Sequence, residues 1–472
     1  MNFPSGTFLL FFAVVFALHW ALPRPRMRKV LLLGASYYFY MSWNVQLVGL
    51  ILLSTIVDYV VGLAMARAET PRARRGYLLV SLAVNLGLLG YFKYAGFFVE
   101  SFGELLVGLG LQANTASLEI ILPVGISFYT FQTLSYTIDI YRRSLQPTRD
   151  VLDFALFVAF FPQLVAGPIV RASHFLPQLV KPARWDGARA AGGLQRMIIG
   201  LAKKVVLADS FALVANEVFA SPESFGFLGS WFGVVAFAFQ IYCDFSAYSD
   251  IAIGAAATLG YDIPENFAHP YVAGNIREFW RRWHMSLSTW LRDYLYIPLG
   301  GSRRGAVRAR LNLLITMFLG GLWHGAAWTF VAWGVFHGLL LGVQRWIDER
   351  RPGGGGAPRS TAIGIVPTFA LVCLGWVLFR AETFADAALL YRNLFGLRSV
   401  AESPMLRTPV LWLALAMVVV HAWVAVTERR ALAGRGAPAW PLLLRTAFLT
   451  VCIGGIVAFF RIEGEAFIYF QF

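Results

Sequence analysis

The chain contains 472 residues, of which 58% are hydrophobic, 15% aromatic and 14% charged, and its formal net charge is +14. Soluble domains carry about 25% charged residues, so this composition excludes a protein built from water-soluble domains, and its apolar content excludes a disordered chain. Three cysteines, far apart within apolar runs, exclude a disulfide framework and predict buried packing residues. We therefore expect an integral membrane protein of the all-α class.

Lysine and arginine residues occur in short clusters between apolar runs. This spacing is typical of the cytoplasmic loops of multi-pass membrane proteins and argues against nucleic-acid binding. The clusters expected in the cytoplasm lie at residues 67–75, 142–149, 303–310 and 348–360. Residues 348–360 contain a run of four glycines and are predicted to form a flexible loop within a single domain over residues 1–472.

The first apolar stretch, residues 7–22, is followed by a basic segment and predicts a retained first helix rather than a cleaved signal. Residues 30–66 carry a single charged side chain, Asp58. Because a spanning helix needs about 20 apolar residues, this stretch predicts a hairpin of two helices that turns near residues 42–44.

Residues 151–170 form an apolar run with basic clusters on both sides, and they contain Pro162, Gly167 and Pro168. A straight span would place one cluster outside, so we expect a broken or re-entrant segment, which is tolerated only where protein or water lines it. Further spans are expected at residues 76–92, 120–141, 192–215, 226–243, 246–260, 309–323, 326–346, 361–379, 409–427 and 441–460. The total is about ten to thirteen transmembrane or re-entrant helices.

Three polar positions within this apolar chain are candidates for function, because each would be costly in lipid. Residues 243–250 place Asp244, Tyr248 and Asp250 between two apolar runs. They predict either a hydrogen-bonded turn that ends a helix or part of a substrate passage.

Residues 275–294 combine arginines and tryptophans with one histidine. As a single helix, they would present Arg277, Arg281 and His284 on one side, with Trp280 beside them. Such a helix either lies in the headgroup interface or lines a polar cavity in which the arginines face an anionic group, such as the phosphates of a nucleotide or carrier.

His324 lies in the glycine-rich stretch FLGGLWHGAAW (318–328), among uncharged residues. Burial disfavours a charged imidazole, and a neutral imidazole can act as a general base. Its neighbours Gly320, Gly321 and Gly325 would allow another backbone or a thin substrate to come close. The alternative is that His324 only packs in the core.

No metal-ligand spacing, nucleophile elbow or dinucleotide-binding fingerprint is present, so neither a metal nor a bound cofactor is predicted. The residues alone leave two classes of function. One is a membrane enzyme that acts through a buried histidine. The other is a non-enzymatic transporter or channel whose histidines and aspartates relay protons or bind solute, although the internal repeats of many transporters are not apparent.

Six stretches together carry a family resemblance: FPQLVAGPI (161–169), YCDFSAYSDIAIG (242–254), NFAHPY (266–271), REFWRRWHMSLSTWLRDYLYIPLGG (277–301), LGGLWHGAAWTF (319–330) and FIYFQF (467–472). In these stretches the chain resembles the membrane-bound O-acyltransferase (MBOAT) family, above all the branch that acetylates bacterial exopolysaccharides such as alginate. The stretches occur in the family's order over nearly the whole chain.

The resemblance implies a many-helix fold around a tunnel, in a multi-pass protein of the bacterial inner membrane. It implies transfer of an acetyl group from a cytoplasmic thioester donor, acetyl-CoA or another acyl thioester, to an extracytoplasmic polysaccharide, directly or through a periplasmic acetyltransferase partner. The catalytic positions that it implies are His324 and His284. Residues expected to bind the donor or substrate are Arg277, Trp280, Arg281, Arg282, Trp323, Asp244, Tyr248 and Asp250.

In this interpretation His324 takes the proton of a hydroxyl that attacks the thioester, and His284 orients that group or donates a hydrogen bond to the developing oxyanion. If both act on one acyl group, their side chains should lie within about 10 Å of each other. His337, further along the chain, is expected to tolerate substitution and to serve as a control.

Overall fold

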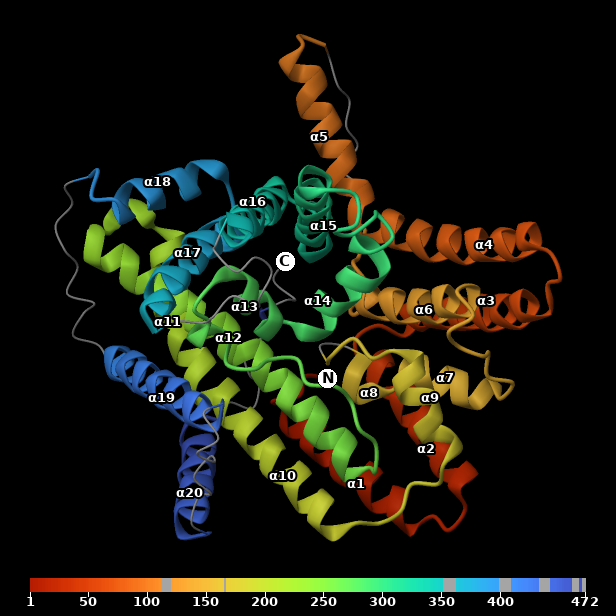
Figure 1. Ribbon diagram of the computed structural model, residues 1–472. Coiled ribbons are helices and arrows are strands. Elements are labelled where there is room, and N and C mark those ends of the chain that lie inside the picture. Colours follow the sequence, from red (N-terminus) through yellow and green to blue (C-terminus); the bar gives the residue numbers. More distant parts are fainter. Residues whose placement is uncertain are drawn as a thin grey trace. The chain divides into compact units, whose positions relative to one another are not determined.

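A computed structural model describes residues 1–111, 120–164, 167–350, 362–398, 409–432, 442–460 and 467–468. Within these ranges every regular element is a helix, which confirms the all-α prediction (Figure 1). The chain forms two compact units that interleave in sequence: residues 1–197 with 251–264, and residues 198–250 with 265–472. The single domain expected over residues 1–472 stays a prediction.

Membrane character is visible in the helices themselves. Five helical stretches of the described chain are long and apolar enough to cross a membrane: Val45–Arg67, Pro71–Gly108, Phe227–Thr258, Trp328–Arg350 and Ile363–Arg380. Three shorter apolar helices cover Gly6–Ala21, Val410–Val424 and Leu443–Phe459. Which loops face the cytoplasm stays a prediction.

The first unit is built largely from helical hairpins. Its elements are α1 (Gly6–Ala21), α2 (Pro25–Met41), η1 (Val45–Leu47), α3 (Val48–Arg67), α4 (Pro71–Leu89), η2 (Gly90–Tyr94), α5 (Ala95–Gly108), α6 (Ile126–Tyr141), α7 (Val151–Ala159), α8 (Phe161–Leu164), α9 (Ala172–Val180) and most of α10 (Gly187–Ala202). Helices α3, α4 and α6 lie side by side (Figure 1). The chain turns between α2 and α3 where the turn was predicted, and the interruption between α7 and α8, just before Pro162, confirms the predicted break in residues 151–170. That α2 and α3 both cross the membrane stays a prediction.

The second unit contains η3 (Lys203–Ala208), α11 (Asp209–Ala220), η4 (Pro222–Ser224), the first 24 residues of α12 (Phe227–Thr258), η5 (Pro270–Val272), α13 (Ile276–Arg282), α14 (Met285–Leu291), η6 (Arg292–Tyr296), α15 (Ala306–His324), α16 (Trp328–Arg350), α17 (Ala362–Arg380), α18 (Phe384–Leu394), α19 (Pro409–Leu432) and α20 (Leu442–Phe459). Helices α15 and α16 pack along each other.

Two predicted boundaries are wrong. The expected spans 226–243 and 246–260 are one continuous helix, α12, so residues 243–250 do not form a turn that ends a helix. The loop expected from Asp348 begins later, because α16 continues to Arg350. Residues 351–360 of that predicted loop lie outside the described residues.

Candidate active site

The basic and aromatic stretch at residues 275–294 is not one helix, as its periodicity predicted. Asn275 caps the start of helix α13, since its side chain accepts a hydrogen bond from the Glu278 N–H at 2.9 Å. It ends before His284, whose backbone has a φ of 41°. A non-glycine residue in this left-handed region cannot continue a right-handed helix, so α14 starts afresh at Met285. His284 therefore lies at the break between α13 and α14.

Asn266, on the loop after α12, fixes the orientation of the His284 ring. Its Nδ2 donates to Ser249 Oγ at 3.1 Å, which directs its Oδ1 toward His284. That oxygen lies 3.0 Å from His284 Nδ1 and accepts a further bond from Ser286 Oγ at 2.9 Å. Because an amide oxygen only accepts hydrogen bonds, His284 Nδ1 carries the hydrogen, and the lone pair of the neutral ring is on Nε2.

His284 is fully buried and lies between α13 and α14, outside the helices long enough to span a membrane. Burial lowers its pKa from the ordinary value near 6.5 to about 3, because the charged form is poorly solvated there. The ring is consequently neutral at physiological pH.

His324 ends helix α15, and its ring centroid lies 6.5 Å from that of His284. The expectation that the two rings share one neighbourhood is confirmed. Aromatic rings surround His324: Trp323 at 5.1 Å, Trp333 at 5.0 Å and Phe379 at 5.3 Å. The histidines thus lie in a largely apolar environment, where electrostatic interactions are stronger than in water.

Glycines bring helices α15 and α16 close together and so place His324. A Cβ on Gly321 would overlap the carbonyl oxygen of Phe330, and one on Gly334 would overlap that of Met317. Gly321 therefore allows the close approach of another backbone, and not that of a thin substrate.

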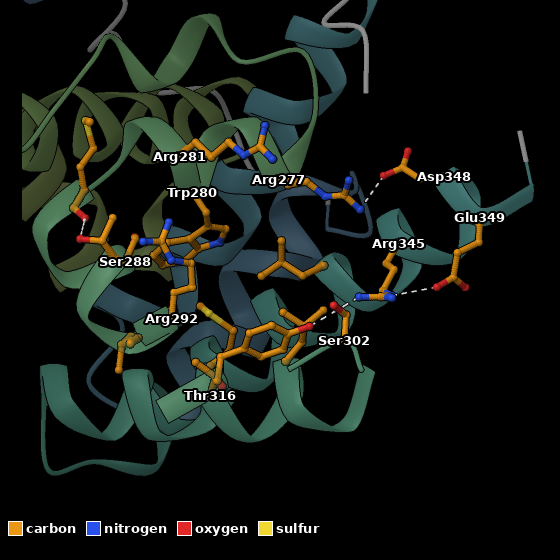
Figure 2. Close-up of a pocket in the computed structure, with 17 residues that line it drawn as sticks. Arg277, Trp280, Arg281, Ser288, Arg292, Ser302, Thr316, Arg345, Asp348 and Glu349 are labelled. Atoms are coloured by element: carbon orange, nitrogen blue, oxygen red, sulfur yellow. Dashed lines mark hydrogen bonds and ion pairs between the residues drawn. The ribbon is translucent and has the colours of Figure 1, made fainter. Parts of the chain in front are cut away.

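An arginine-lined cavity of about 860 Å³ is carried by the same helices (Figure 2). Arg277 and Arg281 from α13, Arg292 from η6 and Arg345 from α16 line it. The other lining residues are Trp280, Met285, Ser288, Thr289, Leu291, Tyr296, Ser302, Leu313, Thr316, Met317, Leu341, Asp348 and Glu349. Four arginines against two carboxylates make the lining positive, which suits an anionic ligand.

The four arginines are engaged to different extents. Arg277 pairs with Asp348 at 2.7 Å and Arg345 with Glu349 at 2.8 Å, as Figure 2 shows, while Arg292 pairs with the adjacent Asp293. Arg281 has no ion pair within the described part of the chain. It is the side chain most available to an anion.

The cavity and the histidines are connected through α15 and a row of rings. Met317 lines the cavity seven residues before His324, which at 1.5 Å per residue is about 10 Å along the helix. Trp280, also in the lining, lies 5.7 Å from Trp333, whose ring contacts His324.

Arg282, which was predicted to bind the donor together with Arg277 and Arg281, does not lie with them in the cavity. Its guanidinium bonds Glu278 Oε1 at 2.9 Å and the Ala268 carbonyl at 3.0 Å, and it does not line the cavity. The spacing of four residues between Glu278 and Arg282 is a sequence signal that could have revealed this pairing.

The predicted polar residues of α12 also have internal partners. Asp250 pairs with Lys203 at 2.5 Å, and Asp244 pairs with Lys204 at 3.2 Å. Tyr248 is buried in the same region. Neither lysine was singled out from the sequence, although two adjacent lysines inside an apolar run are themselves a signal of buried counter-charges.

His337 lies too close to the site to serve as the control substitution that its position in the sequence suggested. It is fully buried, 5.2 Å from Trp280 and 4.9 Å from Trp333. The exposed His174, in the first unit, is the better control. Among the described residues, no three His, Cys, Asp or Glu side chains lie where they could hold a metal ion.

Comparisons with known proteins identify the family of the chain. A family model described as "MBOAT, membrane-bound O-acyltransferase family" matches residues 142–353, which include both histidines and the cavity. The chain is 41% identical over 425 residues to a Pseudomonas putida protein named "Probable alginate O-acetylase AlgI", covering 89% of this chain and 85% of that protein.

Two further relatives carry names for different acceptors. A Helicobacter pylori protein named "Peptidoglycan O-acetyltransferase" is 38% identical over 404 residues, covering 80% of this chain and 75% of that protein. A Bacillus subtilis protein named "Teichoic acid D-alanyltransferase" is 26% identical over 284 residues, covering 55% of this chain and 69% of that protein.

Proposed function

The chain belongs to the membrane-bound O-acyltransferase family and is an O-acyltransferase, and from this premise we propose that it moves an acetyl group from a cytoplasmic thioester to an extracytoplasmic hydroxyl. The observation that carries the proposal is the pair of buried imidazoles, His284 and His324, with ring centroids 6.5 Å apart. This separation leaves room for one acyl group to meet both side chains.

His324 is the general base of the proposed reaction. It takes the proton of the attacking hydroxyl as the new C–O bond forms at the thioester carbonyl. The C–S bond then breaks, and the imidazolium returns the proton to the departing thiolate. Products and reactants balance as an ester and a thiol, without an external acid or base.

His284 orients the acceptor substrate by accepting a hydrogen bond at Nε2 from a polar group beside the attacking hydroxyl, whose single hydrogen goes to His324. Because Nδ1 donates to Asn266, Nε2 of the neutral ring is an acceptor and cannot donate to an oxyanion. Of the two roles considered for His284, the tautomer supports orientation. Asn266 is then a positioning residue, since it selects that tautomer.

The arginine-lined cavity is the proposed donor site. Arg277, Arg281 and Arg345 would meet the phosphates of acetyl-CoA or of a carrier-bound thioester, because guanidinium groups bind phosphate oxygens through two parallel hydrogen bonds. A thin acyl-bearing arm would extend from the cavity toward the histidines. Trp280 and Trp323 would line its apolar part.

The acceptor in this proposal is an exopolysaccharide such as alginate, reached directly or through a periplasmic acetyltransferase, and the location is the bacterial inner membrane. The name of the Pseudomonas putida relative supports the polymer class. The catalyst has to span the membrane in this proposal, because the thioester is made inside the cell and the polymer is modified outside.

Labelled acetyl-CoA tests the proposal with purified protein in lipid nanodiscs. Wild-type protein and His174→Gln should cleave the thioester, with water or an added alginate hydroxyl taking the acetyl group. His324→Gln should not cleave it, although this variant should insert normally. Cleavage by His324→Gln at more than about a tenth of the wild-type rate per molecule would remove His324 as the base. A protein that cleaves no thioester but carries solute across a vesicle membrane, with or without His324, would be a transporter instead.

A further inference from the structure

We propose that Phe467, held in place by Asp244, is a positioning residue that keeps the His284 ring in its working orientation. The inference rests on the proposed function, because it concerns the same pair of histidines. It gives Asp244 a role other than substrate binding. The residues involved all belong to the second unit.

Asp244 ties the segment at residues 467–468 to helix α12. Its Oδ2 accepts the Ile468 N–H at 2.8 Å, while its Oδ1 lies 3.2 Å from Lys204 Nζ. Lys204 in turn pairs with Asp209 at 2.8 Å. The side chains of Lys204 and Asp244 are only 3% and 2% exposed, so the hydrogen bond to Ile468 is made by a desolvated carboxylate that shares the charge of Lys204 with Asp209.

This hydrogen bond places the Phe467 ring against Phe245, which in turn contacts the His284 ring. Phe467 is fully buried and lies 4.1 Å from Tyr248 and 5.6 Å from Phe245, measured between ring centroids. Phe245 meets the His284 ring edge to face at 4.7 Å and 86°. A continuous row of rings therefore runs from the anchored segment to His284.

The row of rings adds a constraint on His284 to the one that Asn266 provides at Nδ1. The edge-to-face contact with Phe245 opposes rotation of the imidazole about its Cβ–Cγ bond. Without Phe467, Phe245 would border a cavity into which it can shift, and His284 would lose its support. A displacement of about 1 Å in a reacting group can reduce turnover about 100-fold.

The test compares Phe467→Ala with Phe211→Ala in the thioester assay. Phe211 is an equally buried phenylalanine of α11, which packs on Phe239 and contacts neither histidine. We expect kcat of Phe467→Ala to fall about 10- to 100-fold while KM for acetyl-CoA stays unchanged, because the arginine cavity is untouched. A kcat per folded molecule equal to that of Phe211→Ala would overturn the proposal.

A milder pair of variants keeps the test decisive if Phe467→Ala folds poorly. Ile468→Pro removes the N–H that donates to Asp244, whereas the conservative Ile468→Val keeps it. We expect the proline variant to lower kcat and the valine variant to keep the wild-type value. Equal turnover in the two variants would show that the anchor does not position the site.

A double-mutant comparison identifies the route through His284. In a His284→Ala background, Phe467→Ala should lower the residual rate no further, because its effect is exerted through the missing imidazole. Full additivity would contradict the proposal. His324→Gln, in the same assay, reports on the acyl-transfer site itself: normal turnover there overturns the proposed function, whereas its loss together with an inert Phe467→Ala overturns only the positioning role.

Discussion

Two buried polar regions of this molecule differ in how their polar groups are used. Between α3, α4 and α6, the Asp58 carboxylate accepts hydrogen bonds from Ser81 Oγ at 2.6 Å and from Asn85 Nδ2 at 2.9 Å. Thr133 donates to the other side of the same Asn85 amide. In the second unit, by contrast, Asn266 engages only one nitrogen of His284, and the helices that carry the histidines also border an arginine-lined cavity.

The comparison shows that burial of a polar group within an apolar chain does not by itself indicate function. Asp58 is a carboxylate in a helix apolar enough to span a membrane, which makes it a functional candidate by default. Its partners, however, satisfy both of its oxygens within three packed helices. We therefore expect Asp58 to serve stability, and His284, His324 and Arg281 to serve the reaction.

The largest contrast is expected at His284, where two substitutions separate orientation from packing. His284→Ala should lower kcat about 100-fold, because the acceptor substrate loses the hydrogen bond that orients it. His284→Asn should cost only about tenfold, because the amide oxygen still accepts a hydrogen bond although it cannot act as a base. Steady-state rates per folded molecule measure both. Equal losses in the two variants would contradict the orienting role.

Asp58→Ala should produce the opposite pattern. The substitution removes the charged acceptor of Ser81 and Asn85, which keep only their bonds to Thr137 and to the Ser81 carbonyl, and this costs about 1–3 kcal/mol of the free energy of unfolding. Thermal unfolding in detergent should occur at a lower temperature, while turnover per folded molecule stays at the wild-type value. A normal unfolding temperature with impaired turnover would make the Asp58 region functional and break the comparison.

Two neighbouring arginines sharpen the comparison within the second unit. Arg281→Ala should raise KM for acetyl-CoA about tenfold with little change in kcat, since about 1.4 kcal/mol of phosphate binding is lost. Arg282→Ala also removes one positive charge, but the Arg282 guanidinium is already paired with Glu278. It should leave KM unchanged. An equal rise in both variants would indicate general charge attraction rather than a bound phosphate.

The smallest effect concerns the pH dependence of stability. The pKa of His284 is lowered by burial from 6.5 to about 3, so below pH 6.5 the unfolded state binds more protons than the folded state. The stability associated with neutral His284 is complete above pH 6.5 and is lost progressively as the pH falls toward 3. Unfolding temperatures measured between pH 7.5 and 5 should decline less steeply in His284→Asn than in the wild type.

The helices and the proximity of the two histidines could be predicted from the sequence, but the local geometry of the site could not. Apolar length and the position of prolines were sufficient for the turn between α2 and α3 and for the break before Pro162. The break at His284 depends on a left-handed backbone at a non-glycine residue, which periodicity does not reveal. Asn266 lies 18 residues earlier in a loop, and only the folded chain brings its amide to the imidazole.

Charge pairing explains the remaining differences. Asp244 and Asp250 do not interrupt α12, because Lys203 and Lys204 from another segment balance their charges. Such long-range pairs leave no periodic pattern in the sequence. The pairing of Arg282 with Glu278 follows a local spacing and was predictable.

The most direct test of the account places His324→Gln and Asp58→Ala on one plot of thioester-cleavage rate against the amount of folded protein in nanodiscs. Asp58→Ala should fall on the wild-type line, with less folded protein but the same rate per molecule. His324→Gln should lie about 10²- to 10⁴-fold below that line at a normal folded amount. A His324→Gln variant that falls on the wild-type line would contradict the assignment of the chemistry to the histidine site.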